Sequence, residues 1–349
     1  MQTNGLVEGG YTTAGRVRSA VLRGVGGQVP ARTVTNDEVA ARTGTSVGWI
    51  EERTGIRERR VVDAGTATSD LAVGAAEQAL KSAGGPAPDV LIVATTTPDH
   101  PCPATAPAVA QRLGLGGVAA FDLNAVCTGF VYGLATAAGL VRSGMAGTVL
   151  VVGADTFSTI VDPDDRDTAV MFGDGAGAVV VGAGDEAEPG ALLAVDLGSD
   201  GSLEQAIQVA AGGSRLPSAA GLPRSARTLA MSGRLVYRHA VRRMSQSCRA
   251  VLTQVGWRPA DVDRLVPHQG NLRILREVAA ELGVDATCLV SNISHVGNTA
   301  AASIPLALAD AVAAGELRPG DRTVITAFGG GATWGSVALR WPHLDRLVS

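Results

Sequence analysis

The feature that most constrains the fold of this chain is an internal duplication. Residues 79–93 (ALKSAGGPAPDVLIV) and 251–266 (VLTQVGWRPADVDRLV) each read as a helix end, a turn that contains glycine and proline, and a buried strand. Residues 142–152 and 314–326 match in the same way, in the same order and at nearly the same offset. Two ordered matches favour a duplicated α/β domain over chance similarity of helix-turn-strand units.

The duplication also pairs residues that could do chemistry. Gly144 and Gly315 stand 171 positions apart, and Cys127 and Asn298 each lie 17 residues before their matching glycine. Each of the two opens an Ala-rich helical run, and His268 directly follows a buried strand of the second copy. If the halves pack about a pseudo-two-fold axis, we expect the cysteine, the histidine and the asparagine to meet in one central cleft.

The matching segments divide the chain near its midpoint. We expect residues 1–185 to form one half, carrying the nucleophile, and residues 186–349 to form the other, carrying the histidine and the asparagine. Each half reads helix, strand, long connection, helix, strand, with β-branched strand cores. This order predicts a layered α/β architecture.

Cys127 is a candidate nucleophile because of its place at the start of a helix. There the helix dipole and free N–H groups are expected to lower the thiol pKa below its usual value of about 8.5. Cys102, Cys248 and Cys288 fit the ordinary role of small buried hydrophobes, and they are too sparse for a disulfide framework or a zinc site. A lone histidine is more often structural than catalytic, although His295 stands close enough to the candidate asparagine to stay in view.

Composition excludes several classes of function. A net charge of −4 and 3% aromatic residues argue against a general nucleic-acid binder. We see no signal peptide and no apolar run of about 18 residues, so we expect a cytoplasmic protein without a membrane partner. The glycine-rich stretch 173–178 leads into a strand, whereas a dinucleotide loop needs a helix there. With no metal-ligand spacing either, we expect chemistry without a cofactor and without a metal.

Six ordered motifs together resemble the family of 3-oxoacyl-[acyl-carrier-protein] synthase III, the initiating ketosynthases of the thiolase superfamily. They are WIEERTGIRER at 49–59, DLNAVCTGF at 122–130, FGDGAGA at 172–178, HQGN at 268–271, GNT at 297–299 and FGGGATWGS at 328–336. The resemblance runs from about residue 18 to residue 340. It implies the thiolase fold, in which two similar α/β halves form a five-layer α-β-α-β-α sandwich, and it implies a homodimer.

The third catalytic position separates the branches of that superfamily. A thiolase would carry a second catalytic cysteine near the C-terminus, and no cysteine follows Cys288. Elongating ketosynthases use Cys-His-His and hydroxymethylglutaryl-CoA synthases use a glutamate, whereas this chain offers Cys127, His268 and Asn298. The resemblance thus implies that an acyl-CoA starter acylates the cysteine, with an oxyanion hole from the N–H groups of Cys127 and Gly330. Decarboxylative condensation with a malonyl-acyl carrier protein then gives a 3-oxoacyl product.

The resemblance also carries over binding residues for coenzyme A, which is here part of a substrate and not a cofactor. Trp49 and Arg166 would sandwich the adenine, and Arg53 would meet the phosphates. Thr45 and Asn271 would line the rest of the coenzyme A and pantetheine path.

The acyl pocket and the histidine motif show two departures from the family pattern. Cys102 stands where the family often places an aromatic residue that closes the acyl pocket, alongside Phe328, so its smaller side chain predicts room for a branched or longer starter. Gly270 replaces the usual alanine in the histidine motif, a change that we expect to be tolerated.

Arg234, Arg238 and Arg242 recur every four residues on one face of a predicted helix. Such a stripe is ordinarily a solvated face. Together with Arg273 it could instead dock an acidic carrier protein.

Two other functions stay open at this point. One keeps the acyl-cysteine but moves the acyl group to another acceptor without decarboxylation, as an acyltransferase or a polyketide-priming enzyme would. The other is a non-catalytic protein that binds acyl carriers, which would be expected to have lost the nucleophile. The retained histidine and asparagine favour condensation, because transfer to an alcohol needs no enolate-binding pair.

Overall fold

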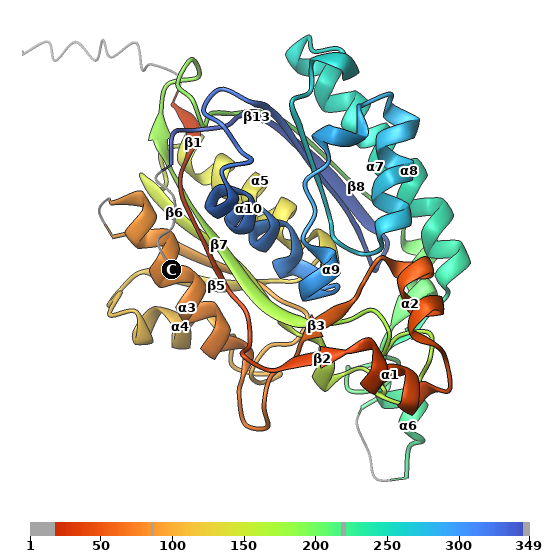
Figure 1. Ribbon diagram of the computed structural model, residues 1–349. Helices are drawn as coiled ribbons and strands as arrows, with labels where there is room; N and C mark the ends of the chain where they lie inside the picture. Colours follow the sequence, from red (N-terminus) through yellow and green to blue (C-terminus); the bar gives the residue numbers. More distant parts are fainter. Residues whose placement is uncertain (1–17, 85–86, 218–220, 345–349) are drawn as a thin grey trace, which may run out of the picture.

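The computed structural model describes residues 18–84, 87–217 and 221–344. Two β-sheets dominate it (Figure 1). The first has the strand order β1-β7-β6-β4-β5, with β1 Ser19–Gln28, β4 Val90–Ala94, β5 Ala119–Leu123, β6 Thr148–Thr156 and β7 Asp174–Gly184. The second has the order β11-β12-β13-β8, with β8 Leu192–Ser199, β11 Arg264–Pro267, β12 Arg322–Gly329 and β13 Thr333–Arg340.

Helices separate and cover the two sheets. α3 (Thr68–Ala83) and α4 (Ala106–Arg112) lie on the outer face of the first sheet, and α7 (Gly233–Val255) and α8 (Leu272–Leu282) lie on the outer face of the second (Figure 1). α5 (Gly129–Arg142) and α10 (Ser303–Ala314) run between the sheets. The predicted five-layer α-β-α-β-α sandwich is confirmed.

The two central helices are apolar on almost every side, as expected of helices covered by a sheet on both faces. Their side chains form one core cluster with the inner faces of both sheets. The close approach of α10 to β7 requires a glycine, because a Cβ on Gly177 would lie 2.6 Å from Leu306 N and 2.7 Å from the carbonyl carbon of Pro305. The sequence places a residue without a side chain where the backbones meet.

Parallel strand pairs bring the candidate residues toward one end of the sandwich. β4 pairs in parallel with β5 and β6, and β11 pairs in parallel with β12. The carboxyl ends of parallel strands lie at one edge of a sheet, so the residues that follow β11 and β4 face the middle of the molecule there. His268 is the residue that follows β11.

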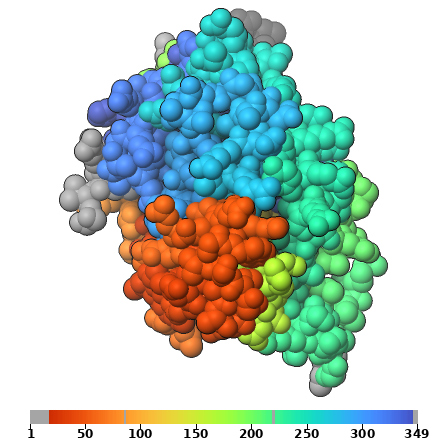
Figure 2. Space-filling model, turned by 45° about the vertical axis from the view of Figure 1, so that its right-hand side comes forward, coloured from red at the N-terminus to blue at the C-terminus, as the bar shows by residue number. Residues whose placement is uncertain are grey.

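Shorter elements surround this end. They are β2 Thr33–Thr35, α1 Asn36–Thr43, α2 Val47–Thr54, β3 Glu58–Arg60, β9 Ile207–Gln208, α6 Arg224–Arg227, β10 Ala230–Met231 and α9 Ile293–Val296. Two of the short 3₁₀ turns, η1 Val126–Thr128 and η6 Ala300–Ala302, also lie here. The orange surface of the N-terminal segment borders the blue surface of the C-terminal half (Figure 2), where α2 contacts α8.

Candidate active site

The sequence around Cys127 places this residue in a tight turn between a strand and a central helix. β5 ends at Leu123, the 3₁₀ turn η1 carries the cysteine, and α5 begins at Gly129. Val126, directly before it, has a φ of +49°, a left-handed conformation that is rare for a β-branched residue. In the second half, the matching 3₁₀ turn is η6, which leads into α10 and begins with Ala300 at a φ of +48°. The structural counterpart of the cysteine turn therefore begins two residues after Asn298, so the expected equivalence of Cys127 and Asn298 is wrong in register.

His268 is held by its neighbours on β12 and α10. Its N–H donates to the carbonyl oxygen of Thr326 at 2.8 Å, and its Nδ1 lies 2.7 Å from Oγ of Ser303. The side chain is buried, and burial lowers the pKa of His268 to about 4. The imidazole is therefore neutral at physiological pH.

Asn298 is fixed by both its backbone and its side chain. Its backbone N–H donates to the carbonyl of Met171 at 2.9 Å, and its backbone carbonyl accepts from Gly173 N–H at 3.0 Å. These two hydrogen bonds connect the second half to the first. Its Oδ1 accepts from Ala300 N–H at 3.0 Å. That bond sets the orientation of the amide, because the other end, Nδ2, is then left to face the cavity as a donor.

One cavity of about 120 Å³ brings the three predicted residues together. Cys127, His268 and Asn298 line it, with Gly270 and Asn271 at the histidine motif. The rest of its wall is mostly apolar and comes from both halves: Val126, Phe157, Met171, Phe172, Ile207, Met231, Gly233, Val236, Tyr237, Ala240, Met244, Ile274 and Phe328. Of the two residues predicted for the acyl pocket, Phe328 therefore lies at this cavity.

The end of β12 approaches the cysteine turn closely. A Cβ on Gly329 would lie 2.8 Å from Cys127 N, and a Cβ on Gly330 would lie 3.4 Å from Cγ2 of Val126. The N–H groups of Cys127 and Gly330 donate to no acceptor among the turn and loop hydrogen bonds of the described residues. The end of β12 and the cysteine turn therefore lie in close backbone contact, and Gly330 directly follows that contact.

The expectation of a lowered thiol pKa is wrong. Burial raises the pKa of Cys127 to about 12, and the negative charge of Asp155 adds to that shift, while a backbone N–H opposes it. Asp155 is itself buried, and its Oδ2 accepts from Ala301 N–H at 3.0 Å across the two halves. The helix-start argument left out the burial of the sulfur, and loss of hydration disfavours the charged thiolate.

The residues predicted for the coenzyme A adenine lie together, although the space between them is closed. The guanidinium carbons of Arg53 and Arg166 lie 5.1 and 4.9 Å from the ring centroid of Trp49. A base stacked between Trp49 and Arg166 needs two contacts of about 3.5 Å each. Arg166 must therefore move away before an adenine can enter.

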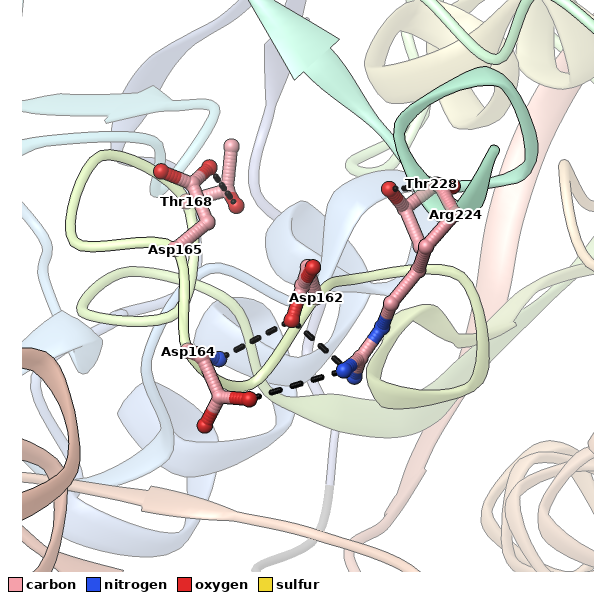
Figure 3. A network of polar contacts seen from close by, with 6 residues as sticks. All are labelled: Asp162, Asp164, Asp165, Thr168, Arg224 and Thr228. Atoms are coloured by element: carbon pink, nitrogen blue, oxygen red, sulfur yellow. Dashed lines mark hydrogen bonds and ion pairs between the residues drawn. The ribbon is translucent and has the colours of Figure 1, made fainter.

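Arg166 belongs to an acidic loop, 162–168, that is tied to the segment around α6 (Figure 3). Arg224 contacts Oδ1 of Asp162 at 3.0 Å and Oδ2 of Asp164 at 3.5 Å, and the hydroxyl of Thr168 donates to Asp165 at 2.5 Å. No sequence motif singled out Arg224. It lies about sixty residues from its partners, so only the fold shows the contact.

The two residues predicted for the rest of the coenzyme A and pantetheine path are Asn271 and Thr45. Asn271 lines the cavity, and it also caps α8 by accepting from Arg273 N–H at 3.0 Å while its Nδ2 donates to the carbonyl of Arg53. The hydroxyl of Thr45 lies 3.0 Å from that of Thr43 at the end of α1. Asn271 thus has a structural role that the sequence did not indicate.

Two candidates lie away from the cavity within one chain. Cys102 is exposed in the loop after β4 and does not line the cavity of Cys127. His295 is also exposed and pairs with Asp310, its Nε2 lying 3.5 Å from Oδ2. The histidine kept in view near the asparagine is therefore not part of the site.

The arginines predicted to meet a carrier protein form an exposed face on α7 and α8. Arg234, Arg238 and Arg242 lie on α7 and form no ion pair within the part of the chain that the structure describes. Arg273 at the start of α8 lies 5.8 Å from the ring of Tyr237, which also lines the cavity. The positive face therefore borders the wall of the cavity at Tyr237.

Two negative findings apply to the described residues. None of their helices is long and apolar enough to cross a membrane. They contain no cluster of three or more His, Cys, Asp or Glu side chains that could hold a metal ion.

Comparison with known proteins agrees with this geometry. Residues 121–201 match the family model described as 3-oxoacyl-[acyl-carrier-protein (ACP)] synthase III, and residues 252–341 match the model of its C-terminal part. A beta-ketoacyl-[acyl-carrier-protein] synthase III of Streptomyces coelicolor is 57% identical over 94% of this chain and 99% of its own length. One from Pseudomonas aeruginosa is 52% identical over 94% of this chain and 98% of its own.

Solved structures give the same result. The crystal structure of 3-oxoacyl-(acyl carrier protein) synthase III from Pseudomonas aeruginosa has a TM-score of 0.88 at 50% identity, covering 94% of this chain and 99% of that one. The priming beta-ketosynthase of the R1128 polyketide pathway has a TM-score of 0.87 at 33% identity, covering 97% and 100%. With the thiolase fold, the cysteine cavity and relatives of more than half identity, the chain belongs to the 3-oxoacyl-[acyl-carrier-protein] synthase III family of acyl-transferring condensing enzymes.

Proposed function

We propose that this protein starts chain synthesis by joining an acyl-CoA starter to a malonyl-acyl carrier protein, with Cys127, His268 and Asn298 as its catalytic residues. The observation that carries the proposal is the shared cavity, in which a thiol at a helix start faces two side chains able to donate hydrogen bonds. The same condensation begins a fatty-acid or a polyketide chain. No cofactor is needed, because neither step changes an oxidation state.

In the first half-reaction the sulfur of Cys127 attacks the thioester carbonyl of the acyl-CoA. The oxyanion that forms would be held by the N–H groups of Cys127 and Gly330, and the close contact between the end of β12 and the cysteine turn supports this role. The bond to the coenzyme A sulfur then breaks, and coenzyme A leaves as a thiol. The proton it takes up balances the one lost by Cys127, which is protonated in the free enzyme because burial raises its pKa to about 12.

In the second half-reaction the malonyl group loses carbon dioxide, and the electron pair of the broken bond passes into the thioester carbonyl. The enolate oxygen would be held by the imidazole of His268 and the amide of Asn298. Its carbon attacks the acyl carbonyl on Cys127, and the carbon–sulfur bond breaks to release a 3-oxoacyl product. The sulfur of Cys127 leaves as a thiolate and takes a proton from solvent, which restores the thiol. Losing one such hydrogen-bond donor typically costs about 10²–10³ in rate.

We also propose that the protein forms a homodimer. β5 is an edge strand of the first sheet with exposed side chains, among them Phe121, which is 39% exposed. An unpaired apolar edge of this kind favours pairing with another strand. A second copy could bring its Cys102 to the acyl pocket, and in that case Cys102→Phe should shift starter preference toward acetyl-CoA. An unaltered chain-length profile would refute that role.

The division into halves at residues 185 and 186 is part of the same proposal. It is supported by the strands, since β1 and β4 to β7 form the first sheet and β8 and β11 to β13 form the second. Each half alone lacks a complete site, because the cysteine and the two donors come from different halves.

Mass spectrometry of the intact protein tests the proposal directly. The enzyme is incubated with a panel of acyl-CoA thioesters and then with malonyl-acyl carrier protein, beside Cys127→Ala as the control. We expect an acyl adduct on Cys127 that disappears as a 3-oxoacyl-carrier protein forms. An adduct that persists without a condensed product would point to the acyltransferase alternative, and no adduct with any thioester would overturn the proposal.

A further inference from the structure

The strongest unassigned feature of the site is the serine behind the histidine. Ser303 is the first residue of α10 and is fully buried. Its Oγ lies 2.7 Å from Nδ1 of His268 and accepts a longer bond, of 3.4 Å, from Gln269 N–H. Within the described residues these two are the hydrogen-bond partners of the Ser303 hydroxyl.

The direction of the Ser303–His268 bond follows from counting donors and acceptors. An amide N–H can only donate, so the bond from Gln269 uses a lone pair of the serine oxygen. The hydroxyl proton needs an acceptor of its own, and Nδ1 of His268 is the one within reach. If Nδ1 carried the proton instead, a fully buried hydroxyl proton would have no partner, which is unfavourable. Ser303 therefore donates and Nδ1 accepts.

This direction decides where the imidazole proton lies. A neutral imidazole has one N–H, so a ring whose Nδ1 accepts must carry its proton on Nε2. Nε2 faces the cavity beside Gly270: a Cβ there would lie 2.9 Å from Nε2 and 3.8 Å from Nδ2 of Asn298. Two N–H donors thus point into the same small space, and the absence of a side chain at Gly270 leaves that space open.

We propose that Ser303 is a positioning residue that holds His268 in the Nε2–H form, so that the histidine donates to the carbonyl of the malonyl thioester and does not act as the base that removes the thiol proton. The inference rests on the proposed function for its second half-reaction. Under this proposal His268 acts in the second half-reaction and not in the first, because an Nε2 that carries hydrogen can donate to the enolate but has no lone pair to accept the proton of Cys127.

The first test compares half-reactions in Ser303→Ala. Loss of one neutral hydrogen bond should slow condensation about tenfold, while acylation of Cys127 stays within about twofold of wild type. Ser245→Ala is the matched control, since Ser245 is also a buried serine on a helix, and it lies outside the cavity. Ser303→Thr retains the hydroxyl and should recover condensation. Equal slowing of both half-reactions, or no slowing of either, would overturn the proposal.

The second test reads the tautomer itself and needs no activity. Nitrogen-15 NMR of histidine-labelled protein, with the His268→Gln variant to assign the resonance, shows which ring nitrogen carries hydrogen. We expect Nε2–H in the wild type and a loss of this preference in Ser303→Ala. Nδ1–H in the wild type would overturn the inference even if the variant failed to fold. It would leave the proposed function intact, whereas an unlabelled Cys127 would count against that function alone.

Discussion

Gly329→Ala is the substitution for which the structure gives the sharpest expectation. The new Cβ would lie 2.8 Å from Cys127 N, 3.0 Å from Thr128 N and 3.1 Å from the carbonyl oxygen of Ala125. All three are backbone atoms of the cysteine turn, so no side chain can rotate out of the way. Ordinary contacts to carbon are about 3.5 Å or longer, so the turn must move by about half an ångström.

The expected consequence is a large loss of acylation. A shift of this size misplaces both the thiol and one proposed oxyanion donor, and we expect the acylation rate to fall about 10²-fold. Overpacking should also lower the free energy of unfolding by about 1–3 kcal/mol. Single-turnover acylation followed by intact-protein mass spectrometry measures the first quantity, and urea unfolding measures the second.

Gly330→Ala is the matched control for this prediction. A Cβ there would lie 3.3 Å from the carbonyl oxygen of Ile207 and 3.4 Å from Cγ2 of Val126, contacts that small adjustments relieve, and alanine keeps the backbone N–H. We expect less than about a tenfold loss of acylation, since no donor is displaced. Wild-type acylation in Gly329→Ala, or an equal loss in both variants, would show that the close approach does not control the oxyanion site.

Three further perturbations test other parts of the site. Burial lowers the pKa of His268 from 6.5 to about 4, so as the pH falls the unfolded chain takes up a proton on this histidine before the folded protein does. The free energy of unfolding of the wild type should therefore fall by about 3 kcal/mol between pH 6.5 and pH 4. Urea unfolding at several pH values should show this loss relative to His268→Gln, and parallel pH profiles would contradict it. Arg224→Ala frees the loop that carries Arg166, so steady-state kinetics should show KM for acyl-CoA rising about threefold with kcat unchanged, while Arg227→Ala has no effect. Arg238→Glu should raise KM for the malonyl-carrier protein about tenfold, equivalent to roughly 1.4 kcal/mol, and leave acylation unchanged; unchanged carrier-protein kinetics would remove the docking proposal.

The fold could be predicted from the sequence because the main evidence for it is a pattern that repeats once along the chain. The strands 90–93 and 264–267 and the offset between Cys127 and Asn298 are patterns along the chain, and the five layers follow once a duplicated α/β unit is accepted. His268 was accessible in the same way, since a residue after a parallel strand lies at the edge where sites form.

The supporting residues could not be predicted, because they act through contacts between distant segments. Ser303 stands 35 residues beyond His268, and its only sequence signal is a polar residue in an Ala-rich helical run. Asp155 lies in a strand that reads as buried, and nothing local shows that it bonds Ala301 of the other half. The prediction of a lowered thiol pKa was wrong for a related reason. The start of a helix can be recognised in the sequence, whereas the loss of hydration at Cys127 depends on its burial in the folded protein.

The 3₁₀ turn that precedes each central helix begins with a residue that is not glycine and has a positive φ. Val126 in η1 adopts +49° and Ala300 in η6 adopts +48°, each at a cost of about 1–3 kcal/mol. A glycine would remove this strain, so the retained valine must contribute something as a side chain. Val126 lines both the cysteine cavity and the neighbouring hollow near Thr97 and Ile160, and it packs toward Gly330. Phe157 and Ile207 also line both spaces, so the strained residue forms part of the wall between the thiol and the wider space beside it, and a glycine at position 126 would open that wall.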